Sequence, residues 1–329
     1  MTRTTRRGIP ALAAGLAFTV CASAQSVPTV PEGSLSGPSA VRELGERLGD
    51  IAASNGISAE DLASILATDL SAYVTPSGSI MYVCPAAPPE IQNETRATGH
   101  AIARGGIPLD DFLNLESRPG SEKTIYLDFN GHQSSGNQWG HNINFPAWDR
   151  NGNTSVFTDA EKEEIIGHWL EVAEDFVGFD INVTTKDPGT AALVKSNADD
   201  TVFGMRVVMS QYTNGFGEGT GGIALLSTFR SNTDTPCFVF NKGLGAGPMS
   251  ASHEAGHTLA LRHDGLNGSE YHPGSSGGSP SWGPIMGAPF GRQLVQWSKG
   301  DYPGATQTLQ QDTAIIANPV NDVDFIDDD

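Results

Sequence analysis

The stretch ASHEAGHTLALRHDG, residues 251–265, places three histidines and a glutamate in a segment that otherwise reads as an apolar helix. An α-helix advances about 100° per residue, so His253 and His257, four residues apart, point the same way within about 40°. They can contact one object together. His263 lies six residues further on and would point about 240° away on a continued helix. It can join the other two only if the helix ends and the chain doubles back.

The pentapeptide from His253 to His257 fits H-E-x-x-H, in which two imidazoles bind zinc and the glutamate acts as general base. Catalytic zinc uses three protein ligands and leaves one position for water, a need that three neutral imidazoles meet. Zinc lowers the pKa of that water to about 7, and we expect Glu254 to accept its proton. A structural zinc site is the alternative, but such sites commonly include cysteine, and we expect neither cysteine in this cluster.

The pattern H-E-x-x-H-x-x-G-x-x-H followed downstream by a Met-turn is the metzincin signature, and the glutamate and the three histidines match it in register. The chain therefore resembles the metzincin zinc peptidases over about residues 120–318. This resemblance implies an α+β fold with a mixed twisted sheet, long helices and a zinc cleft. It also implies that Met286, in the segment GPIMGAPFG, lies beneath the ligands as the Met-turn.

Three positions near the motif refine the resemblance. Asp264, directly after the third histidine, is similar to the reprolysin/adamalysin branch. Ala288 stands two residues after Met286, where astacins and serralysins have a tyrosine that can reach the metal. The usual glycine at the helix end is Ala260. A turn with positive φ there would cost on the order of 1 kcal/mol for a residue with a Cβ, so we expect a slightly strained turn and an intact site.

The segment GGIALLSTF precedes the histidine helix, in the order that the resemblance implies for the edge strand beside the cleft. In that family this strand holds an extended peptide. Backbone groups of Gly222, Ile223, Ala224 and Leu225 would then bind substrate by adding a strand to the sheet. The alternative is an ordinary strand inside the sheet.

The N-terminus has a basic start, a short apolar run and a small-residue cleavage site, which predicts a signal peptide over residues 1–24 and a secreted protein. The run is too short to span a bilayer. Cleavage leaves 16 basic against 38 acidic residues, a formal charge of −22. Because such a surface repels nucleic acid and anionic lipid, we expect neither as a partner. We expect a monomer.

The remaining chain divides into three parts. Residues 25–118 predict a small leader of helices and one hairpin, which would fold with or inhibit the catalytic part. Strands alternate with helices over residues 119–320, which predicts the peptidase domain, a mixed sheet with helices packed on it. Residues 321–329, rich in aspartate, predict a solvated acidic end.

Two cysteines remain after removal of the signal, Cys84 in the leader and Cys237 in the catalytic part. Two thiols in an exported chain favour a disulfide between them. The alternative comes from the resemblance: in some metzincin branches a leader cysteine silences the zinc by filling its open position. That arrangement would leave Cys237 unpaired.

A second, weaker metal signal lies around Asp149, Asn151 and Asn153, which are spaced like part of a calcium loop. We expect a polar turn there and keep Ca²⁺ as a secondary possibility. The sequence thus predicts a secreted Zn²⁺-dependent endopeptidase that acts on protein or peptide substrates. The competing interpretation is a secreted binding or adhesion module that keeps the scaffold without turnover.

Overall fold

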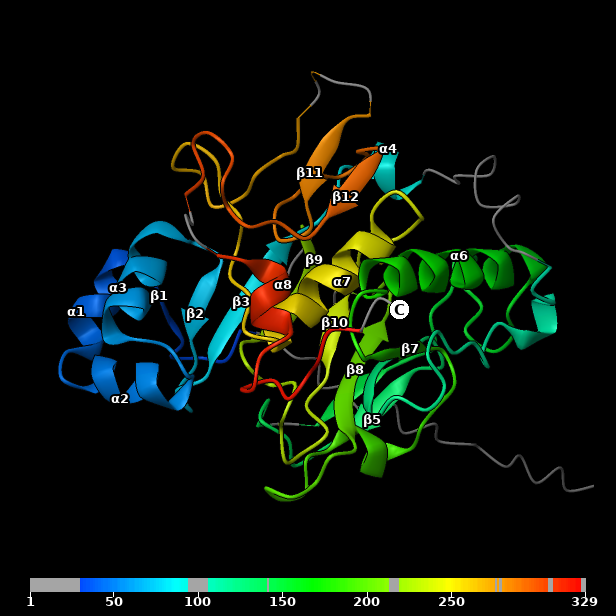
Figure 1. Cartoon of the computed structure of the whole chain (residues 1–329), viewed down its shortest axis with the longest axis horizontal. Coiled ribbons are helices and arrows are strands. Elements are labelled where there is room, and N and C mark those ends of the chain that lie inside the picture. The colour runs from blue at the N-terminus through cyan, green and yellow to red at the C-terminus, as the bar shows by residue number, and fades with distance from the viewer. Residues whose placement is uncertain are drawn as a thin grey trace, which may run out of the picture.

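A mixed eight-stranded sheet runs through the centre of the computed structural model, with helices packed on it (Figure 1). The prediction of an α+β chain built on a large mixed sheet is therefore confirmed. The predicted signal peptide lies outside the described residues. The structure describes residues 30–93, 106–140, 142–212, 219–275, 277, 280–306 and 310–326.

The strand order places the N-terminal strands at one side of the sheet and the most buried strands in its middle. Strands β10, β8, β4 and β7 pair in parallel, whereas the other neighbours in the sheet pair antiparallel. In spatial order the strands are β1 (Leu35–Ser36), β2 (Ala72–Val74), β3 (Ile80–Pro85), β9 (Thr220–Leu225), β10 (Cys237–Val239), β8 (Phe203–Met209), β4 (Lys123–Asp128) and β7 (Asn182–Thr184).

Two helices, α6 (Asp159–Asp175) and α7 (Gly247–Thr258), lie side by side against the sheet (Figure 1). A capping box starts α6: Thr158 accepts from the Glu161 backbone N–H, and the Glu161 carboxylate accepts from the Thr158 N–H in return. All twelve residues of α7 are buried. The main hydrophobic core lies between these helices and the sheet, so the histidine helix is held on all sides.

A hairpin covers part of the sheet with a second, smaller aromatic core. It consists of β5 (His132–Ser134) and β6 (Ile143–Phe145). The ring of Phe145 packs 5.1 Å from Phe238 and 5.8 Å from Phe240, between ring centroids. Side chains of β8, β9 and β3 complete this core, and the residue from β3 is Met81 of the leader.

The N-terminal part has its own core but shares the sheet. Helices α1 (Gly37–Leu44), α2 (Arg47–Ser54) and α3 (Ala59–Thr68) pack with β2 and β3 around a separate hydrophobic cluster. The hairpin predicted at the Pro76-Ser77-Gly78 turn joins β2 to β3. Strand β3 in turn pairs with β9, so the leader extends the sheet of the remaining chain.

Shorter elements complete the described fold, and none of its helices is long and apolar enough to cross a membrane. The acidic end is described over residues 321–326: Asp322 and Asp324 are exposed, as the prediction of a solvated end expects, whereas Val323 is buried and the half-exposed Phe325 ring stacks on Phe179. The shorter elements are α4 (Pro89–Gln92), η1 (Leu109–Asp111), η2 (Thr190–Leu193), β11 (Trp282–Pro284), β12 (Leu294–Gln296) and α8 (Asp312–Ile316).

Candidate metal centre

Helix α7 ends in a tight turn that sends the chain back toward its own histidines. Ala260 has φ +77°, as the substitution of the usual glycine predicted. The N–H of Ala260 donates to the His257 carbonyl, and the N–H of Leu261 donates to the Gly256 carbonyl, both at 3.0 Å. This pair of bonds is a Schellman motif, which ends a helix with a left-handed residue. The reversal required for His263 to approach the helix is therefore present.

The three histidines converge with a fourth residue, Cys84, which the sequence did not place there. Nε2 of His257 and Nε2 of His263 are 3.0 Å apart. The Cys84 sulfur lies 3.5 Å from Nε2 of His253 and of His263, and 3.6 Å from Nε2 of His257. All four ligand atoms lie within 4.8 Å of one another, and all four residues are buried. The group can hold a metal ion.

The protonation of the imidazoles fits such an ion. Nδ1 of His253 lies 2.7 Å from the Ile285 carbonyl oxygen, and Nδ1 of His257 lies 2.8 Å from that of Leu261. Nδ1 of His263 lies 2.7 Å from the Asp69 carboxylate. Because these oxygens accept, each Nδ1 donates, and each Nε2 that carries no proton presents a lone pair to the cluster. Lone pairs converging in a buried space repel one another unless a cation lies between them. The same oxygens fix the ring orientations, as is usual around bound metals.

The S···N distances are those of a small tetrahedral metal site such as zinc, whereas the 3.0 Å between Nε2 of His257 and Nε2 of His263 is shorter than the N···N edge of about 3.3 Å in such a site. A tetrahedral site with Zn–S of about 2.3 Å and Zn–N of about 2.0–2.1 Å has S···N edges of about 3.5 Å. The three measured S···N distances match this value. Without an ion, burial raises the pKa of the Cys84 thiol, with a further rise from Glu254. Ion binding must therefore displace a proton from this sulfur.

Met286 lies behind the histidines, against the helix that carries two of them. A Cβ on Gly256 would come within 2.7 Å of the Met286 sulfur, so the glycine inside the motif gives the methionine its space. The preceding residue, Ile285, accepts the hydrogen bond from His253 Nδ1. The segment around Met286 thus supports a ligand from below, where the resemblance placed it.

Glu254 is buried beside the cluster. Its Oε2 has no hydrogen-bond partner among the described residues. A Cβ on Gly222 of β9 would come within 2.2 Å of Glu254 Oε1, so this glycine lets the carboxylate approach the strand. Burial raises the pKa of Glu254 well above its usual value, and a hydrogen bond with Cys84 lowers it in part. A buried acid with one oxygen unpartnered, next to a group that could hold a metal, is a candidate for chemistry.

Two further leader residues contact the metal ligands directly. Asp69, at the end of α3, accepts from His263 Nδ1 and also from Ser71 Oγ at 2.5 Å. Tyr82, in β3, stacks on the His257 ring at 4.2 Å with an interplanar angle of 7°. The sequence gave no signal for either contact, because both depend on how the leader docks.

Strand β3 lies along the four residues predicted to bind substrate. It pairs antiparallel with β9, in a register that places Cys84 opposite Gly222 and Tyr82 opposite Ala224. Ile223 and Leu225 face Val83 and Met81 in the same way. Beyond Cys84, the Ala87 N–H donates to the Asn241 side chain at 2.8 Å. Strand β9 therefore lies inside the sheet, between β3 and β10, and the side predicted to bind substrate is paired with the leader strand β3.

The predicted disulfide is wrong. Cys84 and Cys237 are both free and buried. Cys84 faces the histidines from β3, whereas Cys237 lies in β10 and belongs to the main core. The expectation that no cysteine joins the histidine cluster is wrong for the same reason. The disulfide was inferred from the count of two cysteines. That count does not distinguish a disulfide from one thiol in a metal site and one packed in the core.

Tyr271, in the loop after the third histidine, was also missed. Its ring centroid lies 4.2 Å from that of His263 and 6.4 Å from that of His253. The neighbouring His272 packs on Trp282 and Tyr302. The loop thus borders the site through Tyr271.

The other candidate places carry no comparable site. Asp149 accepts from the Gly152 N–H and from the side chains of Gln211 and Tyr212. Apart from the cluster at Cys84, no group of three or more His, Cys, Asp or Glu in the described residues is placed to hold a metal. These observations lend the calcium prediction no support.

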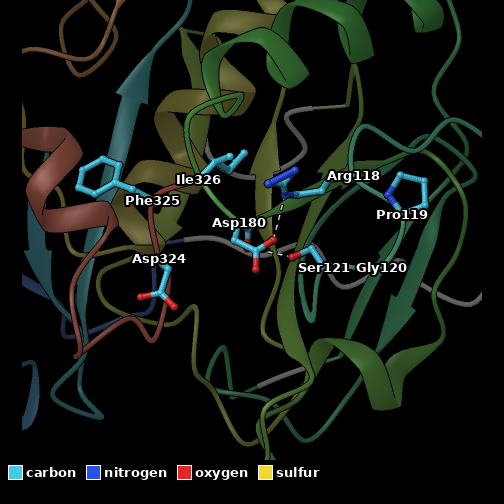
Figure 2. A pocket seen from close by; sticks show the side chains of 8 residues that line it. All are labelled: Arg118, Pro119, Gly120, Ser121, Asp180, Asp324, Phe325 and Ile326. Atoms are coloured by element: carbon cyan, nitrogen blue, oxygen red, sulfur yellow. Dashed lines mark hydrogen bonds and ion pairs between the residues drawn. The ribbon is translucent and has the colours of Figure 1, made fainter. Parts of the chain in front are cut away.

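A wide, open hollow lies by the turn at Arg118 (Figure 2). There Arg118 pairs with Asp180 at 3.0 Å, and Ser121 Oγ donates to the Asp180 carbonyl at 2.8 Å. Both side chains of the ion pair are more than a third exposed. The hollow is a solvated surface whose polar groups already have partners.

Comparisons with protein-family models, with curated proteins and with solved structures found no match to this chain.

Proposed function

We propose that this protein is a secreted, zinc-dependent endopeptidase of the metzincin type, reprolysin-like, kept inactive by its own N-terminal part. One observation carries the proposal. The Nε2 atoms of three histidines converge with the Cys84 sulfur beside Glu254, whose Oε2 has no partner among the described residues, next to strand β9, along which an extended chain lies. Ligands, base and peptide-binding edge are thus found in one place.

His253, His257 and His263 would hold the zinc. When bound, the zinc would polarise a peptide carbonyl and lower the pKa of a water molecule at the position of Cys84. Glu254 accepts a proton from that water on its carboxylate and passes it to the nitrogen of the departing amine. The β9 backbone from Gly222 to Leu225 holds the substrate in extended form. This edge orients the scissile bond over the site.

The leader would block each of these parts at once. The Cys84 sulfur would fill the fourth position, β3 lies along β9, and burial beneath the leader leaves little room for water at Glu254. The space left beside Cys84 and Glu254 is about 10 Å³, room for about one water molecule. Release of the leader, after a cut on the C-terminal side of Cys84, opens all three positions. We therefore prefer the silencing role of Cys84 to the disulfide.

A structural zinc site is the second candidate, and the closed set of four ligands favours it. Structural zinc is usually enclosed by four protein ligands that include cysteine. Such a site has no use for a buried carboxylate without a partner, which costs stability. Glu254 therefore favours catalysis.

The test uses the full chain carrying Glu254→Ala. Intact variants are treated with immobilised wild-type protein to remove the leader, then separated from it and assayed on casein. We expect Glu254→Ala to retain one zinc per chain and to lose about 10²–10⁴-fold in hydrolysis. Glu174→Gln, an exposed change on α6, serves as the control and should behave like wild type.

Three outcomes separate the candidates. Hydrolysis at the wild-type rate by Glu254→Ala would remove its assigned role. A wild-type protein that binds zinc, loses its leader and still cleaves nothing would favour the structural site. Loss of zinc from Glu254→Ala would show that the residue supports the ligands rather than the reaction.

A further inference from the structure

The Tyr271 hydroxyl occupies an unusual position. It is buried and has no hydrogen-bond partner among the described residues, although the ring itself keeps part of its surface exposed. Tyr271 lines the same small cavity as Cys84 and Glu254. Its ring packs against His263, 4.2 Å between centroids. A phenol is thus held next to the metal ligands with its donor unused.

Burial without a partner is unfavourable for a hydroxyl, and such groups are rare in folded proteins. Phenylalanine would fill the same space without this cost. Besides burial, which raises the pKa of Tyr271, the groups that act on this pKa are Cys84, Asp69 and Ser71, and all three belong to the leader. When the leader leaves, the hydroxyl therefore faces whatever replaces Cys84.

Glu254 Oε2 is the second unpartnered polar atom in this cavity. The two groups have complementary chemistry. The carboxylate can accept a proton from water, whereas the phenol can donate a hydrogen bond to an oxygen. Peptide hydrolysis requires both, because negative charge develops on the carbonyl oxygen as the water attacks.

We propose that Tyr271 is a second catalytic residue, whose hydroxyl donates a hydrogen bond to the carbonyl oxygen of the scissile peptide bond after the leader has left. The inference rests on the proposed peptidase function. No covalent bond to Tyr271 forms or breaks, and its proton stays on the phenol oxygen. The hydroxyl is idle in the intact chain and finds its acceptor only in the substrate, most strongly when the oxygen carries charge.

The test compares Tyr271→Phe with Tyr302→Phe. The Tyr302 hydroxyl donates to Gly265 O at 2.9 Å, so it is a half-buried phenol, like Tyr271, but with a structural partner. Each change removes one oxygen. In the intact chain, we expect Tyr271→Phe to keep its zinc and its thermal midpoint or to raise the midpoint, and Tyr302→Phe to lower the midpoint.

After removal of the leader by immobilised wild-type protein, the expected effects are reversed. Tyr271→Phe should lose about 100-fold in kcat with little change in KM, the size of effect seen when one donor to a developing oxyanion is removed. It should bind a phosphinic peptide, which mimics the tetrahedral transition state, more weakly by a similar factor. Tyr302→Phe should keep its kcat and its affinity for the phosphinic peptide.

Two results would overturn the inference while leaving the peptidase proposal intact: wild-type turnover by Tyr271→Phe, or loss of zinc or of stability in its intact chain. Equal losses of kcat in both variants would also overturn it, because any buried phenol in this region would then have the same effect. Failure of processed wild-type protein to cleave any peptide would instead contradict the proposed function.

Discussion

The metal centre has two sides that are built in different ways. On the side of α7, His253 and His257 are fixed by bonds to carbonyls of Ile285 and Leu261, and the Schellman turn sets the chain direction. On the leader side, Cys84 reaches the cluster from a strand 169 residues away from His253 in sequence. The first side belongs to the main core, and the second side rests on a separate one. The difference suggests a permanent half and a removable half.

The largest expected effect comes from removing one ligand on each side. His257→Ala takes a ligand from the permanent half, and we expect stoichiometric zinc to be lost. Cys84→Ala leaves three histidines, so zinc should remain bound, and the full chain should lose its leader sooner than wild type does. Metal analysis and the time course of the new N-terminus measure the two effects. Zinc loss from both variants to the same degree would remove the distinction between the halves.

Acid should weaken the α7 side before the leader side. His168, on α6, is fully buried beside the start of α7, and burial lowers its pKa to about 4. The unfolded chain binds a proton near pH 6.5, so the stability that depends on neutral His168 is present above that pH and is lost as the pH falls toward 4. A shift of this size corresponds to about 3 kcal/mol.

The leader contact at Asp69 responds in a lower range. Burial raises the pKa of Asp69, but His263 and Ser71 lower it further, and the net pKa is below its usual value. Its contribution is therefore present above about pH 3.8 and is lost below that. Unfolding midpoints measured from pH 7 to pH 4 should fall less steeply in His168→Gln than in wild type. Equal slopes would show that His168 does not control this range.

The smallest expected effect concerns the turn that joins the two ligand segments of the permanent half. Ala260 at φ +77° carries a Cβ in the left-handed region, so Ala260→Gly should stabilise the chain by about 1 kcal/mol. Ala53→Gly, at an exposed position inside α2, should destabilise it by a similar amount. Denaturant unfolding measures both signs. A destabilised Ala260→Gly would mean that the turn is not strained.

The sequence predicted the permanent half in detail. The spacing of the histidines and the need for a reversal after α7 follow from the helical period of 3.6 residues, so a single sequence contains them. The positive φ at Ala260 and the strand before the helix are what the resemblance to the metzincins implied.

The removable half could not be predicted in the same way. Which residue of β3 faces Gly222 depends on the register between β3 and β9 and on how α1, α2 and α3 pack behind the hairpin. A one-residue slip would turn Cys84 away from the histidines. Asp69 and Tyr271 reach the cluster only through such long-range packing. The cysteine count pointed to a disulfide because it contains no information on register.

The central claim is that one zinc ion joins the two halves in the intact chain. X-ray absorption at the zinc edge of the full-length, zinc-loaded protein tests it directly. The account predicts one sulfur at about 2.3 Å and three nitrogens at about 2.0–2.1 Å, with the sulfur absent in Cys84→Ala. A zinc shell made of nitrogen and oxygen alone, or an intact protein without stoichiometric zinc, would contradict it.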